Sequence, residues 1–465
     1  MENTLTYAPE GTDQTQLHMF CAEAYTKGAN TREAKRVLSN LLPDIGFRME
    51  SGKRLALFWA QYYRLGNLSR IYFRGIDKPD DDKKPDGYDI NSMLEIIVSM
   101  HSLNHLEADV LAVQNVRETL RRGNRFERWK VLTHESVRLA AIGGRYRTIS
   151  RKVLKDALAI YRDHVLKDEV NRGFACWCIA NVHYFLGEWE TSMPWWRRAR
   201  RQLKFYGDTL WLVSWMDIFH STPFTFKGMF SEMDENAIRG MANAEAAGDL
   251  WGQSYYDTAV TPMVNIAKDK PEEALRRMAE GIKRVEANGI TDIHIYFGIV
   301  GTRVHLYNQD VDGALNHIAG LWQGLDQGGN FELEMYAYLL RFEYIKALLA
   351  VARNNAASSL GLVTRAKKEL NYLNSYDQLP ARPLALSAAA GIALVEGKQA
   401  QAAEFILSSL PLYDKATMPL MVEVSYFMLD ELGVPSTDQK AVARKWLEDH
   451  GVANPERFAH AMLPF

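Results

Sequence analysis

The sequence predicts an all-α protein that folds as a right-handed superhelical solenoid of antiparallel helix pairs. Three observations support this fold class. Apolar residues recur at helical spacing almost throughout, only 15 of the 465 residues are proline, and one pattern of small, turn and large apolar positions returns seven times. Because each pair in a solenoid buries its apolar face against the next pair, a chain of this length needs no single large core.

The repeat is centred on a turn position, and successive copies of its frame lie 40 to 45 residues apart. Four of the seven turn residues are glycine, the residue that enters a left-handed conformation without steric cost. The turn column reads Gly144, Gly187, Gly228, Asp269, Gln309, Asn354 and Gly397. We expect the chain to end one helix and begin the next at each of these residues.

Three more columns keep the same spacing from the turn in every unit. Five residues after it comes an anchor that we expect to close against the preceding helix: Ile149, Ser192, Met233, Ala274, Ala314, Ser359 and Ala402. Twelve residues before each anchor no side chain is large, as a close helix crossing requires: Val137, Ala180, Ser221, Pro262, Thr302, Ala347 and Ala390. Four residues after each anchor the side chain is apolar: Val153, Trp196, Ala237, Met278, Ile318, Val363 and Ile406.

These columns divide the chain into three predicted regions. Residues 1–92 form an N-terminal helical region, 93–413 the solenoid, and 414–465 a set of C-terminal capping helices. Within the first region, "DKPDDDKKPDGYD" (77–89) predicts a charged surface loop, because its prolines interrupt the helical pattern. It lacks the alternating acidic ligands and closing glutamate of a calcium-binding EF-hand.

The columns "A180…G187…S192…W196…A199" resemble the tetratricopeptide repeat (TPR), although that repeat usually spans about 34 residues and these units are longer. A second resemblance lies in "ARKWLEDHGVANPERFAHAMLPF" (443–465). It is similar to the end of the helical-repeat region of large bacterial signalling proteins that carry a STAND-type NTPase. The residues that carry this likeness are Trp446, Gly451, Asn454, Pro455 and Arg457. It implies the sensor part of a bacterial signalling or defence assembly, with an NTPase or effector as partner.

Composition and charge narrow the cellular setting. The 55 Lys and Arg residues are balanced by 57 Asp and Glu, so no global charge directs the chain to nucleic acid or to acidic lipid. Three cysteines are too few for a disulfide framework, which favours a reducing cytoplasmic location. We expect no targeting segment and no membrane span, because no run of about 18 apolar residues occurs.

The stretch "FLGEWETSMPWWRRARRQL" (185–203) combines three tryptophans with a cluster of arginines. In the repeat frame Trp189 and Trp196 are core residues. The basic side chains fall mostly on the outer side of the second helix: Arg197, Arg198, Arg200, Arg201 and Lys204. We therefore interpret the cluster as a solvated basic face, not as a nucleic-acid site.

No catalytic, nucleotide-binding, cofactor or metal motif is found. "GFRMESGKR" has the wrong glycine spacing for a P-loop, and Arg54 stands where Ser or Thr would bind Mg²⁺. Cys176 and Cys178 have the wrong spacing for a zinc site and are expected to be buried packing thiols. The sequence therefore favours a binding module over an enzyme.

The candidate functional residues lie on the first helix of each unit, which lines the concave side of such superhelices. Aromatic residues, Arg and Asn on this side are the types that dominate binding hot spots. The nine candidates are Arg138, Trp177, Asn181, Tyr184, Trp215, Tyr256, Tyr296, Arg303 and Tyr344. We expect them to hold a protein segment or peptide. A small-molecule sensor, with the aromatic cluster from Trp177 to Tyr256 around a ligand, and a helical-repeat enzyme are the two alternatives.

Overall fold

The computed structural model describes residues 14–27, 30–44, 46–48, 52–76, 89–101, 104–160, 162, 168–203, 210–285, 290–354, 359–434 and 437–464. Within these ranges the protein is helical and contains no strand, which confirms the prediction of an all-α fold. Residues 77–88 of the predicted charged loop lie outside the described residues. None of the described helices is long and apolar enough to cross a lipid bilayer.

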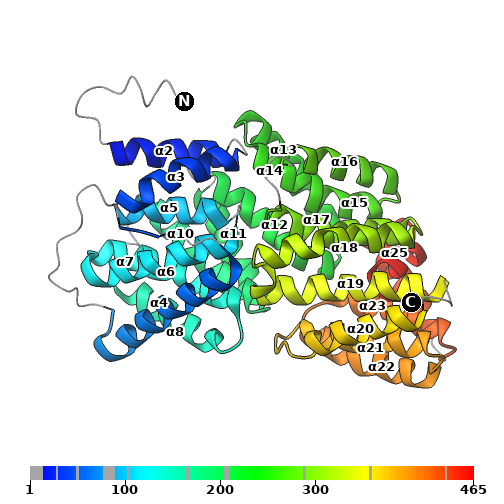
Figure 1. The fold of residues 1–465 in the computed structure, drawn as a ribbon. Helices are drawn as coiled ribbons and strands as arrows, with labels where there is room; N and C mark the ends of the chain where they lie inside the picture. The colour runs from blue at the N-terminus through cyan, green and yellow to red at the C-terminus, as the bar shows by residue number, and fades with distance from the viewer. Residues whose placement is uncertain are drawn as a thin grey trace.

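The described residues up to Ile160 form seven helices, which we call the N-terminal part (Figure 1). They are α2 (Gln14–Lys27), α3 (Thr31–Asp44), α4 (Lys53–Arg74), α5 (Ile90–His101), α6 (His105–Arg122), α7 (Arg125–Ile142) and α8 (Tyr146–Ile160). Helix α7 begins with a capping box, in which the Asn124 side chain accepts from Glu127 N–H at 2.9 Å and the Glu127 carboxylate accepts from Asn124 N–H at 2.7 Å.

The remaining helices continue as packed neighbours along the chain (Figure 1). They are α10 (Glu169–Phe185), α11 (Trp189–Leu203), α12 (Leu210–Lys227), α13 (Phe230–Ala246), α14 (Leu250–Tyr255), η2 (Tyr256–Val260), α15 (Thr261–Ala267), α16 (Pro271–Lys283), α17 (Ile293–Tyr307), α18 (Val311–Gln327), η4 (Asn330–Glu332), α19 (Glu334–Asn354), α20 (Ser359–Leu373), α21 (Ala381–Val395), α22 (Gln399–Lys415), α23 (Pro419–Glu431), α24 (Thr437–Asp449) and α25 (Pro455–Met462). The pairs that the repeat frame joins are in close contact: α7 with α8, α10 with α11, α12 with α13, α15 with α16, α17 with α18, α19 with α20 and α21 with α22.

The turn column has a recurring backbone geometry. Six of its seven residues have a positive φ, between 49° at Gly144 and 76° at Gly397, and these include the non-glycine residues Asp269 and Gln309. In five units the amide of the residue directly after the turn position bonds back to a carbonyl five residues earlier, as Glu188 N–H does to His183 O at 2.9 Å. The seventh position, Asn354, is the last residue of α19. The predicted turns are therefore confirmed at six positions.

The packing columns are buried as the frame predicts. All seven large apolar positions are at most 6% exposed, and the small column is buried throughout. The anchor column differs in two units, because Ser359 is half-buried in the sixth and Ile149 is half-buried in the first, where the next residue, Ser150, is fully buried. The Ser150 hydroxyl donates to Ser136 O at 2.7 Å, as the Ser192 hydroxyl donates to Ala180 O at 2.8 Å. The reason is that the turn of this unit contains two glycines with positive φ, Gly143 and Gly144, which moves the anchor by one residue.

The C-terminal helices do not project from the end of the chain but pack back onto α12 and α17. Asn454 caps α25, and the Arg457 guanidinium donates to Tyr307 O at 3.2 Å and to Asp269 at 3.0 Å. The buried ammonium of Lys346 donates to Ala461 O at 2.5 Å and pairs with Glu343 at 2.8 Å. Residues of the C-terminal sequence pattern therefore anchor the end of the chain on the turns and inner helices of earlier units.

A second set of long-range contacts joins the N-terminal helices to residues 326–380, and we call this contact region the seam. Gly144 N–H donates to the Glu334 carboxylate at 2.8 Å, and Arg147 forms an ion pair with the same carboxylate. The Lys53 ammonium lies 2.7 Å from Asp326, and the Gln378 amide donates to Phe185 O at 2.8 Å. These polar contacts bring together residues 187 to 273 positions apart in sequence.

Candidate functional site

The nine predicted candidates lie on α7, α10, α12, η2, α17 and α19, always on the first helix of their unit. Eight of them are buried, with at most 6% of each residue exposed, and Trp215 is half-buried. Three of the nine line a common cavity: Arg138, Trp177 and Trp215. The other six make contacts within the protein interior.

The cavity has a volume of about 100 Å³ and lies at the seam. Its walls come from two sides that are distant in sequence. One side is formed by α4, α5, α6, α7, α10 and α12, and the other by Asp292, η4 and the start of α19. Trp177, Phe185, Phe219 and Tyr336 supply much of the aromatic surface. The space is thus formed only because the seam brings these segments together.

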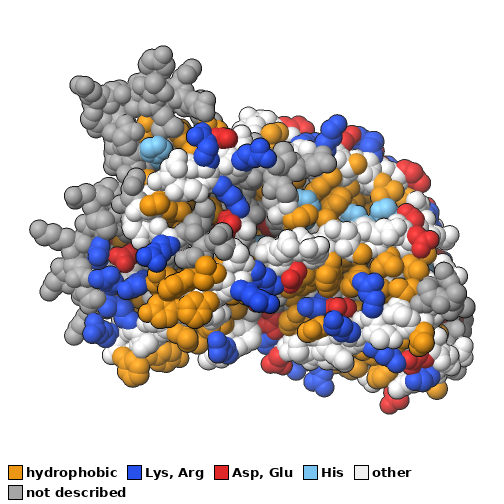
Figure 2. Space-filling model, in the orientation of Figure 1, with side chains coloured by type: hydrophobic (Ala, Val, Ile, Leu, Met, Phe, Trp, Pro, Cys, Tyr) orange, Lys and Arg blue, Asp and Glu red, His pale blue; other side chains and the backbone are white. Residues whose placement is uncertain are grey.

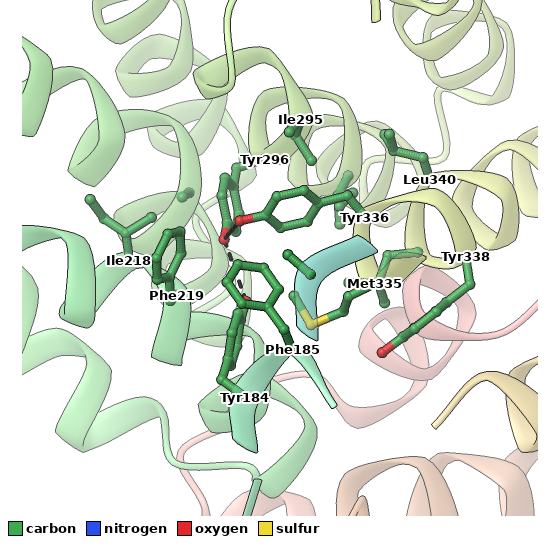
Figure 3. Packing of buried hydrophobic residues seen from close by; sticks show 14 of the residues in the cluster. Tyr184, Phe185, Ile218, Phe219, Ile295, Tyr296, Met335, Tyr336, Tyr338 and Leu340 are labelled. Carbon is green, nitrogen blue, oxygen red and sulfur yellow. Dashed lines mark hydrogen bonds between the residues drawn. The ribbon is translucent and has the colours of Figure 1, made fainter. Parts of the chain in front are cut away.

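A chain of tyrosine hydroxyls lies next to this cavity and explains two of the predicted residues. The hydroxyls of Tyr184 and Tyr296 are 3.4 Å apart, and those of Tyr296 and Tyr336 are 3.2 Å apart (Figure 3). Burial raises the pKa of all three hydroxyls, so they stay neutral and share hydrogen bonds. The Phe185 ring packs edge-on against Tyr336, with centroids 5.9 Å apart. Tyr184 and Tyr296 therefore support the wall through Tyr336.

Three further candidates are held by charged groups in the interior. The Tyr256 hydroxyl donates to Asp217 at 3.1 Å. Tyr256 lies on the π-helical turn η2, which precedes Pro262, a residue without an amide proton. The Arg303 guanidinium donates to Glu343 at 2.8 Å. The Tyr344 hydroxyl accepts a hydrogen bond from the Arg365 guanidinium. Their contacts are those of core residues.

The ninth candidate, Asn181, is fully buried. Its amide donates to Trp177 O at 2.9 Å, so it fixes the turn of α10 from which the Trp177 ring extends. Its side-chain oxygen has no hydrogen-bond partner in the described part of the chain. Asn181 therefore supports the cavity without lining it.

An ionic network forms one wall of the cavity. The Arg64 guanidinium donates to both carboxylate oxygens of Asp109, at 2.6 and 2.7 Å, and Arg138 forms an ion pair with the same carboxylate. Arg138 also donates to Glu135 at 2.7 Å. Burial raises the pKa of Glu135 to about 7, although the Arg64 charge lowers it. Burial also lowers the pKa of both arginines. The network balances positive and negative groups, so this wall carries little net charge.

Three histidines, His101, His105 and His134, lie beside this network. The His101 ring centroid is 5.8 Å from that of His105 and 6.0 Å from that of His134. The His134 ring stacks on Trp177 at 6.2 Å with an interplanar angle of 4°. Burial lowers the pKa of His105 and of His134 to about 4, and that of His101 well below its usual range. All three rings are therefore neutral at pH 7.

Asp292 closes the opposite side of the cavity. It is 5% exposed, and the Tyr255 hydroxyl donates to its Oδ2 atom. Burial raises the pKa of Asp292 well above its usual range, although the hydrogen bond from Tyr255 lowers it. The nearby His294 ring accepts a hydrogen bond from the Thr291 amide at 3.1 Å. Burial thus disfavours the charged form of the Asp292 carboxyl group.

Several polar atoms around the cavity have no hydrogen-bond partner among the described residues. They are Arg64 Nε, His101 Nε2, His105 Nε2, Arg138 Nε, Trp177 Nε1 and Asp292 Oδ1. A buried polar group without a partner costs about 1–3 kcal/mol, so such atoms usually mark the position of a bound molecule or water. Their concentration around one cavity makes this the candidate functional site.

Sequence reasoning did not select Arg64, His101, His105 or Asp109 for this site. All four lie before residue 131, outside the part of the chain where the repeat columns are clear. The available signal was the unusual density of polar residues in an apolar helical context, such as the two histidines four residues apart. That spacing alone does not say which distant helix faces them.

The other residues that the sequence singled out are packing residues or surface residues. Trp189 and Trp196 are at most 2% exposed, and Cys176 and Cys178 are buried, as predicted. Arg197, Arg198 and Arg201 are exposed, but Arg200 turns inward to pair with Asp217. Lys204 lies outside the described residues. In the same ranges no cluster of His, Cys, Asp or Glu has the geometry of a metal site.

Comparisons with known proteins give no identification. No protein-family model matches the chain. No curated protein matches its sequence either. Its function must therefore be inferred from the site and the fold.

Proposed function

We propose that the protein is a sensor module that binds a small molecule in the cavity at the seam. The observation that carries this proposal is the set of six unpartnered polar atoms around one aromatic-lined space. Ligand sites typically combine apolar walls with a few polar groups that fix orientation. This is the small-molecule alternative of the sequence interpretation, with the site moved toward the N-terminal helices.

The wall chemistry favours an uncharged ligand with an aromatic or apolar body. Trp177 and Tyr336 offer flat surfaces, whereas the neutral imidazoles of His101 and His105 can each donate or accept a hydrogen bond. Arg64 and Arg138 are already paired with the carboxylates of Asp109 and Glu135, so an anion would compete with existing ion pairs. A small neutral heteroaromatic compound fits these requirements best.

The signal would arise from the position of the cavity. Its walls belong to both sides of the seam, so a bound molecule adds contacts that exist only when the seam is closed. A ligand shifts a conformational equilibrium by its difference in affinity for the two states. Binding would therefore favour the closed seam, which is otherwise held by polar contacts such as Arg147–Glu334.

For the architecture we propose a right-handed TPR-like solenoid, closed on its inner side by the C-terminal helices. The recurring positive-φ turns and the buried columns support it. We further propose a bacterial, cytoplasmic origin in a signalling or defence assembly, on the strength of the C-terminal resemblance. Trp446, at the start of that pattern, packs against the Gly228 turn.

Thermal-shift measurements on the full chain test the ligand proposal. The probes are small neutral heteroaromatics such as indole and benzimidazole, with benzoate as a charged control. A true ligand at 100 times its Kd stabilises the folded state by about 2.7 kcal/mol and raises Tm. The variant Ala141→Leu, which places a larger side chain at the cavity wall, should keep the fold and lose the shift. Ile238→Ala, an exposed position 66% accessible, is the matched control.

Two results would refute the proposal. One is a panel in which no neutral compound raises Tm. The other is a stabilisation that Ala141→Leu leaves unchanged, because the compound then binds elsewhere.

The second candidate function is the protein-binding scaffold that the sequence favoured. Eight of the nine inner residues are buried, so a peptide has little access to them. What favours a protein partner is a different surface: helix α4 exposes large apolar side chains over most of its length. A pull-down with the full chain at native salt should recover a protein whose capture depends on this helix.

A further inference from the structure

Helix α4 has two faces of different character. Its inner face contains Ala56, Ala60, Arg64, Asn67 and Ile71, all buried. Its outer face exposes six large apolar residues by 47 to 87%: Leu55, Phe58, Tyr62, Leu65, Tyr72 and Phe73. In Figure 2 a hydrophobic patch bordered by Lys and Arg side chains occupies the position of α4 in Figure 1. Contiguous exposed apolar surface of this kind marks interaction sites on folded proteins.

The rotation of α4 is fixed by polar contacts on its inner face. Arg64 binds Asp109 through two hydrogen bonds of 2.6 and 2.7 Å. The Asn67 amide donates to Val113 O at 2.8 Å, and Arg70 donates to Leu120 O at 3.0 Å. The outer apolar residues cannot turn inward without breaking these bonds. Their exposure is therefore a property of the packed helix.

The spacing of the outer residues matches a helix–helix contact. Leu55, Phe58, Tyr62, Leu65, Ser69 and Tyr72 are separated by alternating steps of three and four, and all six are exposed. This is the a/d pattern of a heptad repeat, in which side chains insert between those of a partner helix. We call these six residues the α4 ridge. The ridge spans five turns of helix without a partner helix among the described residues.

The surroundings of the α4 ridge are cationic. The 22-residue helix contains five Lys or Arg and no Asp or Glu, although Arg64 among them is buried and bound to Asp109, and Lys53 pairs with Asp326. Neighbouring helices add Arg117, which lies over the Tyr63 ring at 5.4 Å, and Lys152, which lies over the Tyr72 ring at 5.7 Å. A second copy of the same ridge would bring like charges together. An acidic helix would pair its carboxylates with this border.

We propose that the α4 ridge is the docking site for an acidic amphipathic α-helix of a partner protein. The proposal rests on the second candidate function, protein recognition, and names its partner class. It also links protein recognition to small-molecule binding, because Leu57, Gln61 and Arg64 on the other side of α4 line the cavity. A ligand that contacts them would alter the helix that presents the ridge.

Fluorescence anisotropy with a designed peptide tests the proposal on the full chain. The probe is a labelled four-heptad peptide with Leu at positions a and d and Glu at positions e and g. Its controls are a scrambled peptide of the same composition and a version with Lys in place of Glu. We expect saturable binding of the Glu peptide that weakens with added salt, and no saturable binding of either control.

Two variants with exposed substitutions separate docking from folding. Phe58→Ser with Tyr62→Ser should weaken binding at least about tenfold, because aromatic anchors carry most of the energy of such contacts. Arg54→Glu should weaken binding of the Glu peptide and allow binding of the Lys peptide. Leu360→Ser, which alters a residue 83% exposed on α20, is the matched control and should leave binding unchanged. Urea midpoints equal to wild type verify that each variant is folded.

Three outcomes would overturn the proposal. The first is a Glu peptide that binds no better than its scrambled form. The second is binding of the protein to vesicles of phosphatidylserine and phosphatidylcholine that the double variant abolishes, which would make the ridge a lipid contact. The third is a dimer in sedimentation that the double variant dissociates, which would make the ridge a self-association surface. None of these outcomes affects the proposal of a small-molecule site, which the thermal shifts with neutral compounds test separately. If a pull-down recovers a protein partner that binds another surface, the protein-recognition function stands and only the α4 ridge is excluded as its site.

Discussion

Replacement of His134 by Gln should make the protein less sensitive to acid. The ring is 4% exposed, stacks on Trp177, and has a pKa lowered by burial to about 4. In the unfolded chain the same ring has a pKa of about 6.5. Between these two values the unfolded state binds a proton that the folded state does not, so stability falls as the pH decreases.

The magnitude follows from the two pKa values. At pH 7.5 His134 is neutral in both states and contributes no pH dependence. At pH 5 the proton bound by the unfolded state lowers the free energy of unfolding by about 2 kcal/mol. Glutamine has no such proton. The stability difference between wild type and His134→Gln should therefore shift by about 2 kcal/mol in favour of the variant between pH 7.5 and pH 5.

Urea denaturation followed by far-UV circular dichroism at both pH values measures this shift. The raised pKa of Glu135 has the opposite effect, since it increases the free energy of unfolding as the pH falls. Because wild type and variant share Glu135, the difference between the two proteins removes most of this contribution. His460→Gln, at a half-exposed ring, controls for loss of a histidine as such. A stability difference that is the same at pH 7.5 and pH 5 would refute the assignment of His134 as a buried neutral ring.

Further predictions concern the repeat and the C-terminal end, and urea midpoints test each of them. Gln309→Gly should stabilise the protein by up to about 1 kcal/mol, because φ is 60° there and glycine removes the steric cost; a loss of stability would contradict the turn geometry. Gly187→Ala should cost about 1–3 kcal/mol, since φ is 75° and the added Cβ would lie 2.7 Å from Pro380. Trp196→Ala should cost about 3–5 kcal/mol, as expected for a buried indole, and a cost below 1 kcal/mol would exclude it from the core column. Lys346→Met should cost about 3 kcal/mol and make the C-terminal helix easier to cleave by trypsin, because Glu343 and the Ala461 carbonyl lose a buried partner; unchanged cleavage would show that this contact does not hold α25 in place.

The sequence by itself determined the local architecture. Helical spacing, the turn residues and the size of the packing residues are properties of short segments, and a left-handed turn can be read from Gly187 or Gly397 alone. Burial of Trp196 and of the other large apolar positions follows from the same frame. The anchor of the first unit is Ser150 and not the predicted Ile149, because two successive glycines, Gly143 and Gly144, could each be the turn residue.

Only the tertiary structure decided which of the predicted binding residues are accessible and where the cavity lies. The seam pairs Arg147 with Glu334, and Lys346 holds Ala461, and no periodic pattern links residues more than 100 positions apart. Most of the predicted groove residues are buried in the core, whereas the cavity gathers polar groups such as His101 from helices without a clear repeat. Helical periodicity reports which side of a helix is apolar, but the element that covers that side depends on how the whole chain curves. For this reason the exposed ridge of α4 and the enclosed cavity behind it became visible only in three dimensions.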